Sequence, residues 1–387
     1  MIASPFSASY LGTADTMESV IQTAALHSWR AMNVLVTTCH TASLADFAVY
    51  YHCVHQAFNC PAAGILARQS AEQLAQQPWP GPGFSWHTHL VDQAGVLAWV
   101  SKQRAAADLV PVCPPAQLDA FDEALYQQVR SLPVQPAPSH RGLLVHVTRY
   151  LRLRQPSPTA SRYLYALLAH WPEVPIPEAG GPPLLLGLTD GLAAELLVLI
   201  RAHQTGIHHP IIGARVEQGL RYLLALKRDV DFLEQQYSVF PYQVDAHVPD
   251  GTFSAELSWR RGDVGQAWLL YEAQAILHDR ELVNIAELVG LNTLMRKNLS
   301  SNLVVDSGFY QGAAGVAQLY GQLYRSSGQS AYCNAYYYWL SRTQDLLTAP
   351  QAPAQDENKL LSGLVGAALV LLAAAKTATP NWRDVLV

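Results

Sequence analysis

Two stretches of this chain decide its fold: residues 257–270 read LSWRRGDVGQAWLL, and residues 309–320 read FYQGAAGVAQLY. Each contains two glycines three positions apart, followed by small and apolar residues. Related stretches, some of them weaker, occur at 88–100, 139–151, 186–200 and 360–372. Such self-similarity indicates a repeat architecture, in which each repeat is one structural unit.

The spacing of these stretches defines the unit. Their first glycine position falls at 92 (an aspartate), 142, 191, 262, 312 and 363, in steps of 50, 49, 71, 50 and 51. Two helices of about 15 residues with short connections take up roughly 50 residues. One helical hairpin per repeat is therefore predicted. The longer step predicts an insertion at about 229–254.

Each repeat has two unlike halves, apolar on most sides after the glycines and then richer in charged and aromatic residues. Helices that are apolar all round lie inside a protein, and amphipathic helices cover them. We predict an all-α fold, an α/α toroid made of a double ring of helical hairpins with about six to seven repeats. The toroid is expected over 81–387, with 1–80 as an N-terminal helical region packed on the barrel.

Composition limits the classes of function. The chain has 387 residues, 50% hydrophobic and 14% charged, with a formal net charge of -5 and no run of Lys or Arg, so nucleic acid is not an expected partner. The most apolar run, Leu360 to Ala375, is shorter than the roughly 20 residues of a spanning helix and predicts a buried helix. No signal-peptide pattern is visible, and the five cysteines are irregularly spaced, so we expect a cytoplasmic protein with reduced thiols.

The order of the later motifs carries a family resemblance. LGLTDGLAAELL, LSWRRGDVGQAWLL, YQGAAGVAQLY and LSGLVGAALVLL follow one another as in the lanthionine synthetase C family, which the chain resembles from about residue 85 and most closely from Leu184 onward. The resemblance implies a peptide cyclase in which two cysteines and a histidine, from WCYG-like and CHG-like motifs, bind zinc. The zinc activates a substrate thiol as a thiolate, which adds to a dehydroamino acid. A second histidine, from an AHG-like motif, and an arginine handle protons and the enolate.

This sequence departs from that pattern at each functional position. Arg260 stands at the first zinc cysteine, and Tyr310-Gln311 replaces Cys-His. Asp190 stands at the AHG histidine, and the family's arginine falls near Glu256. A guanidinium has no lone pair to donate, and Gln is a weak zinc ligand. We therefore expect no zinc at the family's position, no other cofactor and no ordinary cyclase activity.

Two functions fit this mixture of kept scaffold and changed side chains. The first is a zinc-free peptide-binding or scaffolding component of ribosomal peptide maturation, whose partners are a peptide substrate or precursor peptide and other maturation enzymes. Arg260 would then fill the metal volume and pair with Asp190 or Glu256. The alternative is a divergent cyclase, lyase or hydrolase in which Asp190 and Glu256 are the acid and base and Arg260 stabilises an anion. The substrate-binding residues expected at the mouth of the barrel are Trp259, Arg261, Asp263, Tyr310 and Gln311.

Two lesser hypotheses use other residues. A relocated metal could be held by His87 and His89, or by the group His52, Cys53, His55 and Cys60, because His and Cys are metal ligands. A protein–protein adaptor could use the aromatic run from Tyr336 through Tyr337 and Tyr338 to Trp339, because aromatic residues are enriched at interfaces.

Overall fold

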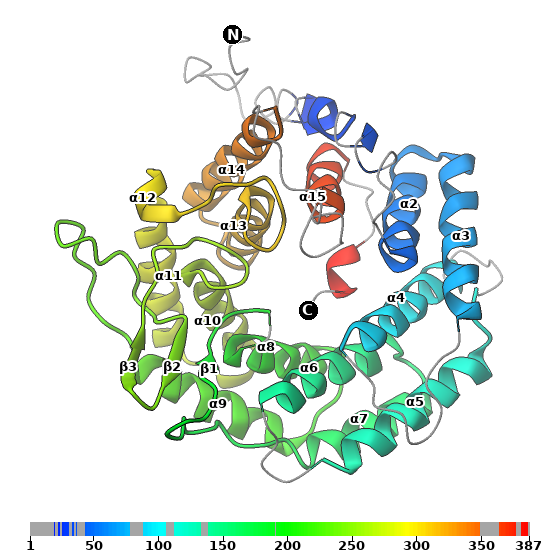
Figure 1. Cartoon of the computed structure of the whole chain (residues 1–387), viewed down its shortest axis with the longest axis horizontal. Helices are drawn as coiled ribbons and strands as arrows, with labels where there is room; N and C mark the ends of the chain where they lie inside the picture. The colour runs from blue at the N-terminus through cyan, green and yellow to red at the C-terminus, as the bar shows by residue number, and fades with distance from the viewer. Residues whose placement is uncertain are drawn as a thin grey trace.

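The helices of the computed structural model form two concentric rings (Figure 1), which confirms the predicted α/α toroid. The residues described are 19, 22, 23, 25–30, 33, 34, 36, 43–77, 88–105, 112–132, 138–189, 191–348, 364–376 and 381–385. Within them the inner ring consists of α2 (Leu44–Phe58), α4 (Thr88–Ala105), α6 (Pro138–Leu153), α8 (Leu192–Gln204), α10 (Asp263–Leu277), α13 (Ala313–Ser327) and α15 (Leu364–Ala375). Each inner helix contacts the next, and α15 contacts α2, so the ring is closed.

The outer ring consists of the helices that follow the inner ones along the chain. They are α3 (Pro61–Gln76), α5 (Pro115–Arg130), α7 (Pro158–Leu168), α9 (Pro210–Ala225), α11 (Arg280–Leu294) and α14 (Ser330–Thr348). Four of them, α3, α5, α7 and α9, have proline in the first turn. Proline is well suited to this position, because the amide hydrogen that it lacks has no partner in the first turn of a helix.

The inner helices are buried on most sides, as their apolar sequences predict. In α15 the side chains from Val365 to Leu372 are all buried, and α8 is buried from Leu192 to Ile200. The described part of the apolar run that ends at Ala375 is therefore a buried helix, and 360–363 lies outside the described residues. No described helix is both long and apolar enough to span a bilayer.

The N-terminal hairpin differs from the sequence-based expectation. Helices α2 and α3 stand in the ring, between α15 and α4, rather than packing on a barrel that begins at residue 81 (Figure 1). The predicted insertion contains β2 (Gln243–Asp245) and β3 (Val248–Thr252), which pair antiparallel. With β1 (Leu184–Leu185), which pairs with β2, they form a small three-stranded sheet beside the ring.

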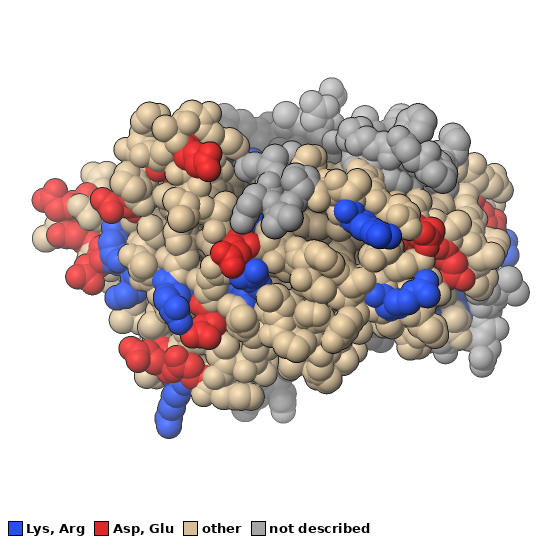
Figure 2. Space-filling view, turned by 90° about the horizontal axis from the view of Figure 1, so that it is seen from below, with Lys and Arg blue, Asp and Glu red and all other residues tan. Residues whose placement is uncertain are grey.

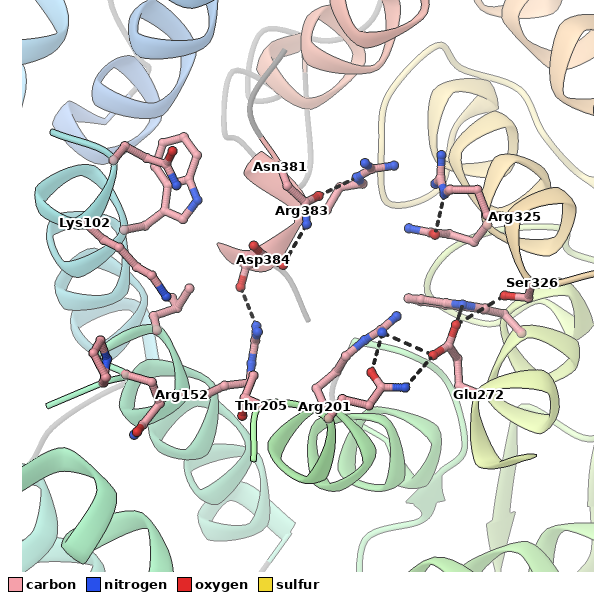
Figure 3. Close-up of a pocket in the computed structure, with 18 residues that line it drawn as sticks. Lys102, Arg152, Arg201, Thr205, Glu272, Arg325, Ser326, Asn381, Arg383 and Asp384 are labelled. Atoms are coloured by element: carbon pink, nitrogen blue, oxygen red, sulfur yellow. Dashed lines mark hydrogen bonds and ion pairs between the residues drawn. The ribbon is translucent and has the colours of Figure 1, made fainter. Parts of the chain in front are cut away.

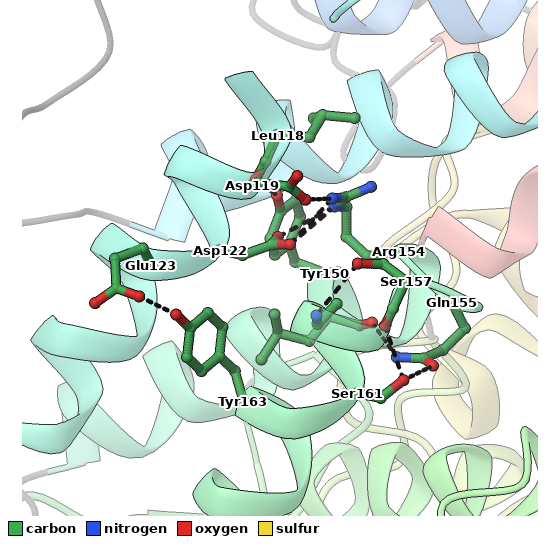
Figure 4. Close-up of polar contacts among 12 residues, drawn as sticks. Leu118, Asp119, Asp122, Glu123, Tyr150, Arg154, Gln155, Ser157, Ser161 and Tyr163 are labelled. Atoms are coloured by element: carbon green, nitrogen blue, oxygen red, sulfur yellow. Dashed lines mark hydrogen bonds and ion pairs between the residues drawn. The ribbon is translucent and has the colours of Figure 1, made fainter. Parts of the chain in front are cut away.

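Polar contacts fasten the outer helix α5 to its neighbours (Figure 4). Arg154, directly after α6, donates to both carboxylate oxygens of Asp122 at 3.0–3.2 Å and to Asp119 at 2.7 Å. Tyr163 of α7 donates to Glu123 of α5. The face of the molecule shown in Figure 2 is mostly uncharged, with acidic and basic side chains interspersed.

Candidate functional site

Three loops converge where α8, α10 and α13 begin, at the mouth of the barrel. A Cβ on Gly187 would lie 1.7 Å from the carbonyl oxygen of Arg260, so the loop before α8 touches the loop before α10. The amide of Arg260 donates to the carbonyl oxygen of Tyr310 at 3.3 Å, which joins the loop before α10 to the loop before α13. The lack of a side chain on Gly187 is therefore what allows the loops to meet.

The starts of these three helices give the mouth its electrostatic character. Gly191, Gly262 and Gly312 are the N-cap residues, and none of them can supply a side-chain cap. The first amide groups of a helix carry partial positive charge. Three parallel helix N-termini beside one mouth therefore favour negatively charged or carbonyl-bearing groups there.

Side chains of opposite charge lie at this mouth. The carboxylate of Glu256 is 3.8 Å from the guanidinium of Arg261, which also lies over the ring of Tyr242 at 4.9 Å. The other oxygen of Glu256, Oε1, is buried and has no hydrogen-bond partner among the described residues. A buried carboxylate oxygen without a donor is costly, so Oε1 is a candidate for contact with a bound molecule.

A second carboxylate, Asp306, belongs to the same group and was missed in the sequence. Its Oδ1 accepts the amide hydrogen of Gly308 at 2.7 Å. Burial raises the pKa of Asp306, the amide of Gly308 lowers it, and the charge of Glu256 raises it again. Glu256 and Asp306 are thus close enough for the charge of Glu256 to disfavour the ionised form of Asp306. The only sequence signal is an acidic residue in the loop that precedes a glycine pair.

The predicted site residues fall into three groups. Arg260 and Tyr310 are half-buried and Gln311 is exposed, all in the mouth loops. Asp190 lies outside the described residues. Among the described carboxylates none lies within 4.0 Å of Arg260, and the partner of Glu256 is Arg261.

Two residues predicted at the mouth are instead part of the interior. Trp259 is 2% exposed and packs against Phe309, with ring centroids 4.9 Å apart. Asp263 is 1% exposed, and its Oδ2 lies 2.5 Å from Nη2 of Arg296. Both corrections have one cause: from 257 to 266, the loop before α10 and its first turn, every residue except Arg260 and Arg261 is buried.

The donors at the positions implied for zinc do not suit that ion. Arg260, Tyr310 and Gln311 offer a guanidinium, a phenol and an amide, whereas zinc takes thiolate, imidazole or carboxylate ligands. Across the described residues no group of three or more His, Cys, Asp and Glu side chains could hold a metal ion. The residues present therefore do not fit the family's metal.

The other histidines and cysteines named in the sequence have separate surroundings. His52 is buried edge-on against Trp99, and this burial lowers its pKa to about 4. Nδ1 of His55 lies 2.8 Å from the carbonyl oxygen of Cys60, and Cys53 is a fully buried thiol. His89 is exposed, and His87 lies outside the described residues.

The aromatic run on α14 is divided between core and surface. Trp339 is 4% exposed and Tyr338 is 41% exposed, while Tyr336 and Tyr337 are half-buried. Only part of the run could contact a partner protein.

Comparisons with known proteins concern the family and the fold of the chain. A family profile described as lanthionine synthetase C-like protein matches residues 176–387. No curated protein matches the chain. A solved structure of nisin cyclase is similar over 95% of this chain and 97% of that chain, with a TM-score of 0.65 and 12% sequence identity. At that identity the likeness shows the shared fold.

Proposed function

The chain belongs to the lanthionine synthetase C-like family, and on that premise we propose that it binds a peptide substrate or precursor peptide without using zinc. It would serve as a binding or scaffolding component of ribosomal peptide maturation, together with other maturation enzymes. Membership of this family suggests a peptide ligand, because a lanthionine synthetase acts on a peptide. The side chains at the mouth are the reason for proposing a function without zinc.

One observation carries this function: the loops at the mouth keep their tight contacts while the side chains between them are Arg260, Arg261, Tyr310 and Gln311. These groups donate hydrogen bonds to carbonyl and carboxylate oxygens. Together with the helix N-termini they suit an extended peptide that presents such oxygens. They offer no thiolate or imidazole with which to activate a thiol.

A labelled peptide tests binding and cyclisation together. The probe is a synthetic peptide with one dehydroalanine, one cysteine and a fluorescent label. We expect its anisotropy to rise on addition of the protein, while mass spectrometry after alkylation shows the cysteine thiol still free. Arg261→Gln should weaken binding, because it removes a charge at the mouth. Arg221→Gln, on the exposed side of α9, is the matched control.

Metal analysis of the purified protein gives an independent test. Inductively coupled plasma mass spectrometry should find no stoichiometric zinc in the natural protein. A triple variant, Arg260→Cys with Tyr310→Cys and Gln311→His, should take up zinc if these positions correspond to the family's ligands. Stoichiometric zinc in the natural protein, or loss of the peptide thiol, would contradict zinc-free binding.

A second candidate function is supported by the carboxylates. The sequence-based alternative, catalysis by Asp190 and Glu256 with Arg260, gains from the raised pKa of Asp306 beside Glu256, since perturbed carboxylate pairs are common in active sites. In that case Glu256→Gln and Asp306→Asn would each abolish conversion of a dehydrated peptide and leave its anisotropy unchanged. If neither variant alters any product, catalysis by these carboxylates is excluded.

A further inference from the structure

A large cavity opens at the opposite end of the barrel from the mouth. Its volume is about 880 Å³, and it is lined by the last turns of the inner helices and by η1 (Trp382–Val385) (Figure 3). Helix α8 starts at the mouth and ends at this cavity. Its 13 residues, with a rise of 1.5 Å per residue, separate the two by about 20 Å.

A group of packed aromatic rings lies between the two ends of the barrel. Phe309, in the loop before α13, contacts both Trp259 and Trp382, with centroid distances of 4.9 and 5.6 Å. Trp259 also lies 5.8 Å from Trp268, which borders the cavity. Since Trp259, Trp268, Phe309 and Trp382 are all at most 2% exposed, the cavity is a compartment separate from the mouth.

The charged side chains around the cavity are predominantly basic. Five cations line it: Lys102, Arg152, Arg201, Arg325 and Arg383. They face two carboxylates, Glu272 and Asp384. The cations come from α4, α6, α8, α13 and η1, and they point toward a common centre (Figure 3).

Of the two carboxylates, Glu272 is already fully engaged. One of its oxygens accepts from the indole of Trp268 at 2.9 Å and from the hydroxyl of Ser326 at 3.2 Å. The other lies 3.1 Å from Arg201 and accepts from Gln204 at 3.3 Å. Glu272 therefore balances Arg201. The other carboxylate, Asp384, accepts from the side chain of Asn381 at 2.9 Å, and its charge raises the pKa values of Arg152 and Arg383.

Arg325 and Arg383 share a neutral partner. When the side-chain amide of Gln318 is turned to satisfy its neighbours, its oxygen accepts from Nη2 of Arg325 and from Nη1 of Arg383, each at 3.2 Å. Neither arginine lies within 4.0 Å of a carboxylate of the described residues. Two guanidinium groups thus converge on one uncharged atom at the rim of the cavity, where Arg325 is exposed and Arg383 is half-buried.

The pKa values of these arginines are lowered. Burial is the largest cause of the lowering of the pKa of Arg325 to about 10; the charge of Arg383 and, less strongly, that of Arg201 act in the same direction, whereas Tyr336 and Glu272 raise the pKa. Burial likewise lowers the pKa of Arg383. The protein thus holds cations together at a cost in free energy, which a bound anion would offset.

Attraction to helix ends accounts for only part of this arrangement. Cations in the last turn of a helix are stabilised by the helix dipole, and Arg201 and Arg325 occupy such positions. That effect requires each cation to be near its own helix end. It does not require Arg325 and Arg383 to converge on one oxygen inside a cavity.

We propose that this cavity binds a multivalent phosphate-type anion, held between Arg325 and Arg383 with Arg201 and Lys102 at its edge. The planar guanidinium matches two phosphate oxygens at once, and several such groups around one centre suit a ligand with many acceptor oxygens. The volume is sufficient for more than a single phosphate group. This anion site is independent of the peptide-binding function of the mouth.

Pyrophosphate is the probe for this site. We expect it to raise the melting temperature of the protein by about 3 °C at roughly 100 times its Kd. Arg383→Gln and Arg325→Gln should each weaken pyrophosphate binding at least tenfold by isothermal titration calorimetry. Their melting temperatures without ligand should not fall, because each substitution relieves repulsion. Arg221→Gln, an exposed arginine on α9, is the matched control and should keep both the affinity and the ligand-induced shift.

Three results would overturn the assignment. The first is an equal thermal shift from potassium chloride at matched ionic strength, which would indicate general screening. The second is tighter binding of citrate than of pyrophosphate, which would indicate a carboxylate ligand. The third is unchanged pyrophosphate affinity in the variants. If both arginine variants fail to fold, Lys102→Gln at the exposed rim replaces them, with a severalfold loss of affinity expected.

Discussion

Replacing Asp263 by Asn should destabilise the protein strongly, although this residue has the sequence position of a ligand contact. Its carboxylate lies 2.5 Å from Arg296 and accepts the amide hydrogen of Val239 at 2.9 Å. Arg296 also donates to the carbonyl oxygen of Tyr237 and, at 3.0 Å, to the side chain of Asn292. The pair therefore joins the start of α10 to α11 and to the segment that leads into the sheet.

The size of the effect follows from burial. The side chains of Asp263 and Arg296 are 1% and 0% exposed. Asparagine keeps the shape of aspartate but leaves the guanidinium as an uncompensated buried charge, which costs about 3 to 5 kcal/mol. Unfolding entropy of about 2.1 cal/mol/K per residue gives roughly 0.8 kcal/mol/K for 387 residues, so the melting temperature should fall by about 4 to 6 °C.

Differential scanning calorimetry and urea denaturation measure this change. A double variant, Asp263→Asn with Arg296→Met, should recover part of the loss, because it removes the unpaired charge. Glu217→Gln breaks the exposed pair with Arg221 and should cost less than about 1 kcal/mol. If Asp263→Asn changes stability by less than that control while peptide binding is lost, Asp263 is a ligand contact and the structural reasoning is refuted.

Three further variants test the mouth and the core. Gly187→Ala should lower the free energy of unfolding, measured by urea denaturation, by more than about 3 kcal/mol, because the new Cβ would lie 1.7 Å from the carbonyl oxygen of Arg260. Gly142→Ala is the control: it has open space around the new Cβ and should be neutral or stabilising. Asp306 has a raised pKa in the folded state, so its ionisation reduces the stability of the protein as pH rises from about 3.8 through that raised pKa. Asp306→Asn should flatten this part of the plot of stability against pH. An unchanged plot would contradict the raised pKa. The pKa of His52 is lowered to about 4, so the protein should lose roughly 3 kcal/mol between pH 6.5 and pH 4, and His52→Phe should suppress that loss.

The toroid could be predicted because its determinants are local and repeated. A period of about 50 residues and the contrast between apolar and amphipathic halves are properties of the sequence itself. The same local signal misplaced α2 and α3, because the inner helix α2 contains no glycine, whereas each of the stretches that mark the other repeats contains at least one. The contacts of α2 with α4 and with α15, which is far away in sequence, place this hairpin in the ring.

The candidate site was less predictable because it depends on side-chain direction. Asp263 and Glu256 are both acidic residues beside a glycine pair, yet one is buried with Arg296 and the other lies at the mouth with Arg261. The partner of Asp263 is Arg296, which lies just after α11 and 33 positions along the chain. Asp306 could have been found as an acidic residue in the equivalent loop of the next repeat, had the loops been compared as well as the helices.

The cavity also had a signal in the sequence, a recurring arginine, which a search based on the glycine pairs did not consider. Arg152, Arg201 and Arg325 recur in the last turns of three inner helices. Read one by one, each is an ordinary cation at a helix end. Closure of the ring brings these helix ends together. The arginines, each favourably placed at its own helix end, then form one cluster of positive charge. A repeat protein can therefore build a binding site from residues whose individual positions are explained by helix stability.

The short helix η1 shows how the two ends of the barrel depend on the same few residues. Trp382 packs under the mouth against Phe309, and the next residue, Arg383, reaches the oxygen of Gln318 that Arg325 also contacts. Arg152 of α6 donates to the carbonyl oxygen of Asp384 at 2.8 Å, which holds the turn in the barrel. One turn of chain thus supplies both Trp382 of the aromatic partition and Arg383 of the cavity. A substitution that displaces η1 should therefore disturb both ends of the barrel.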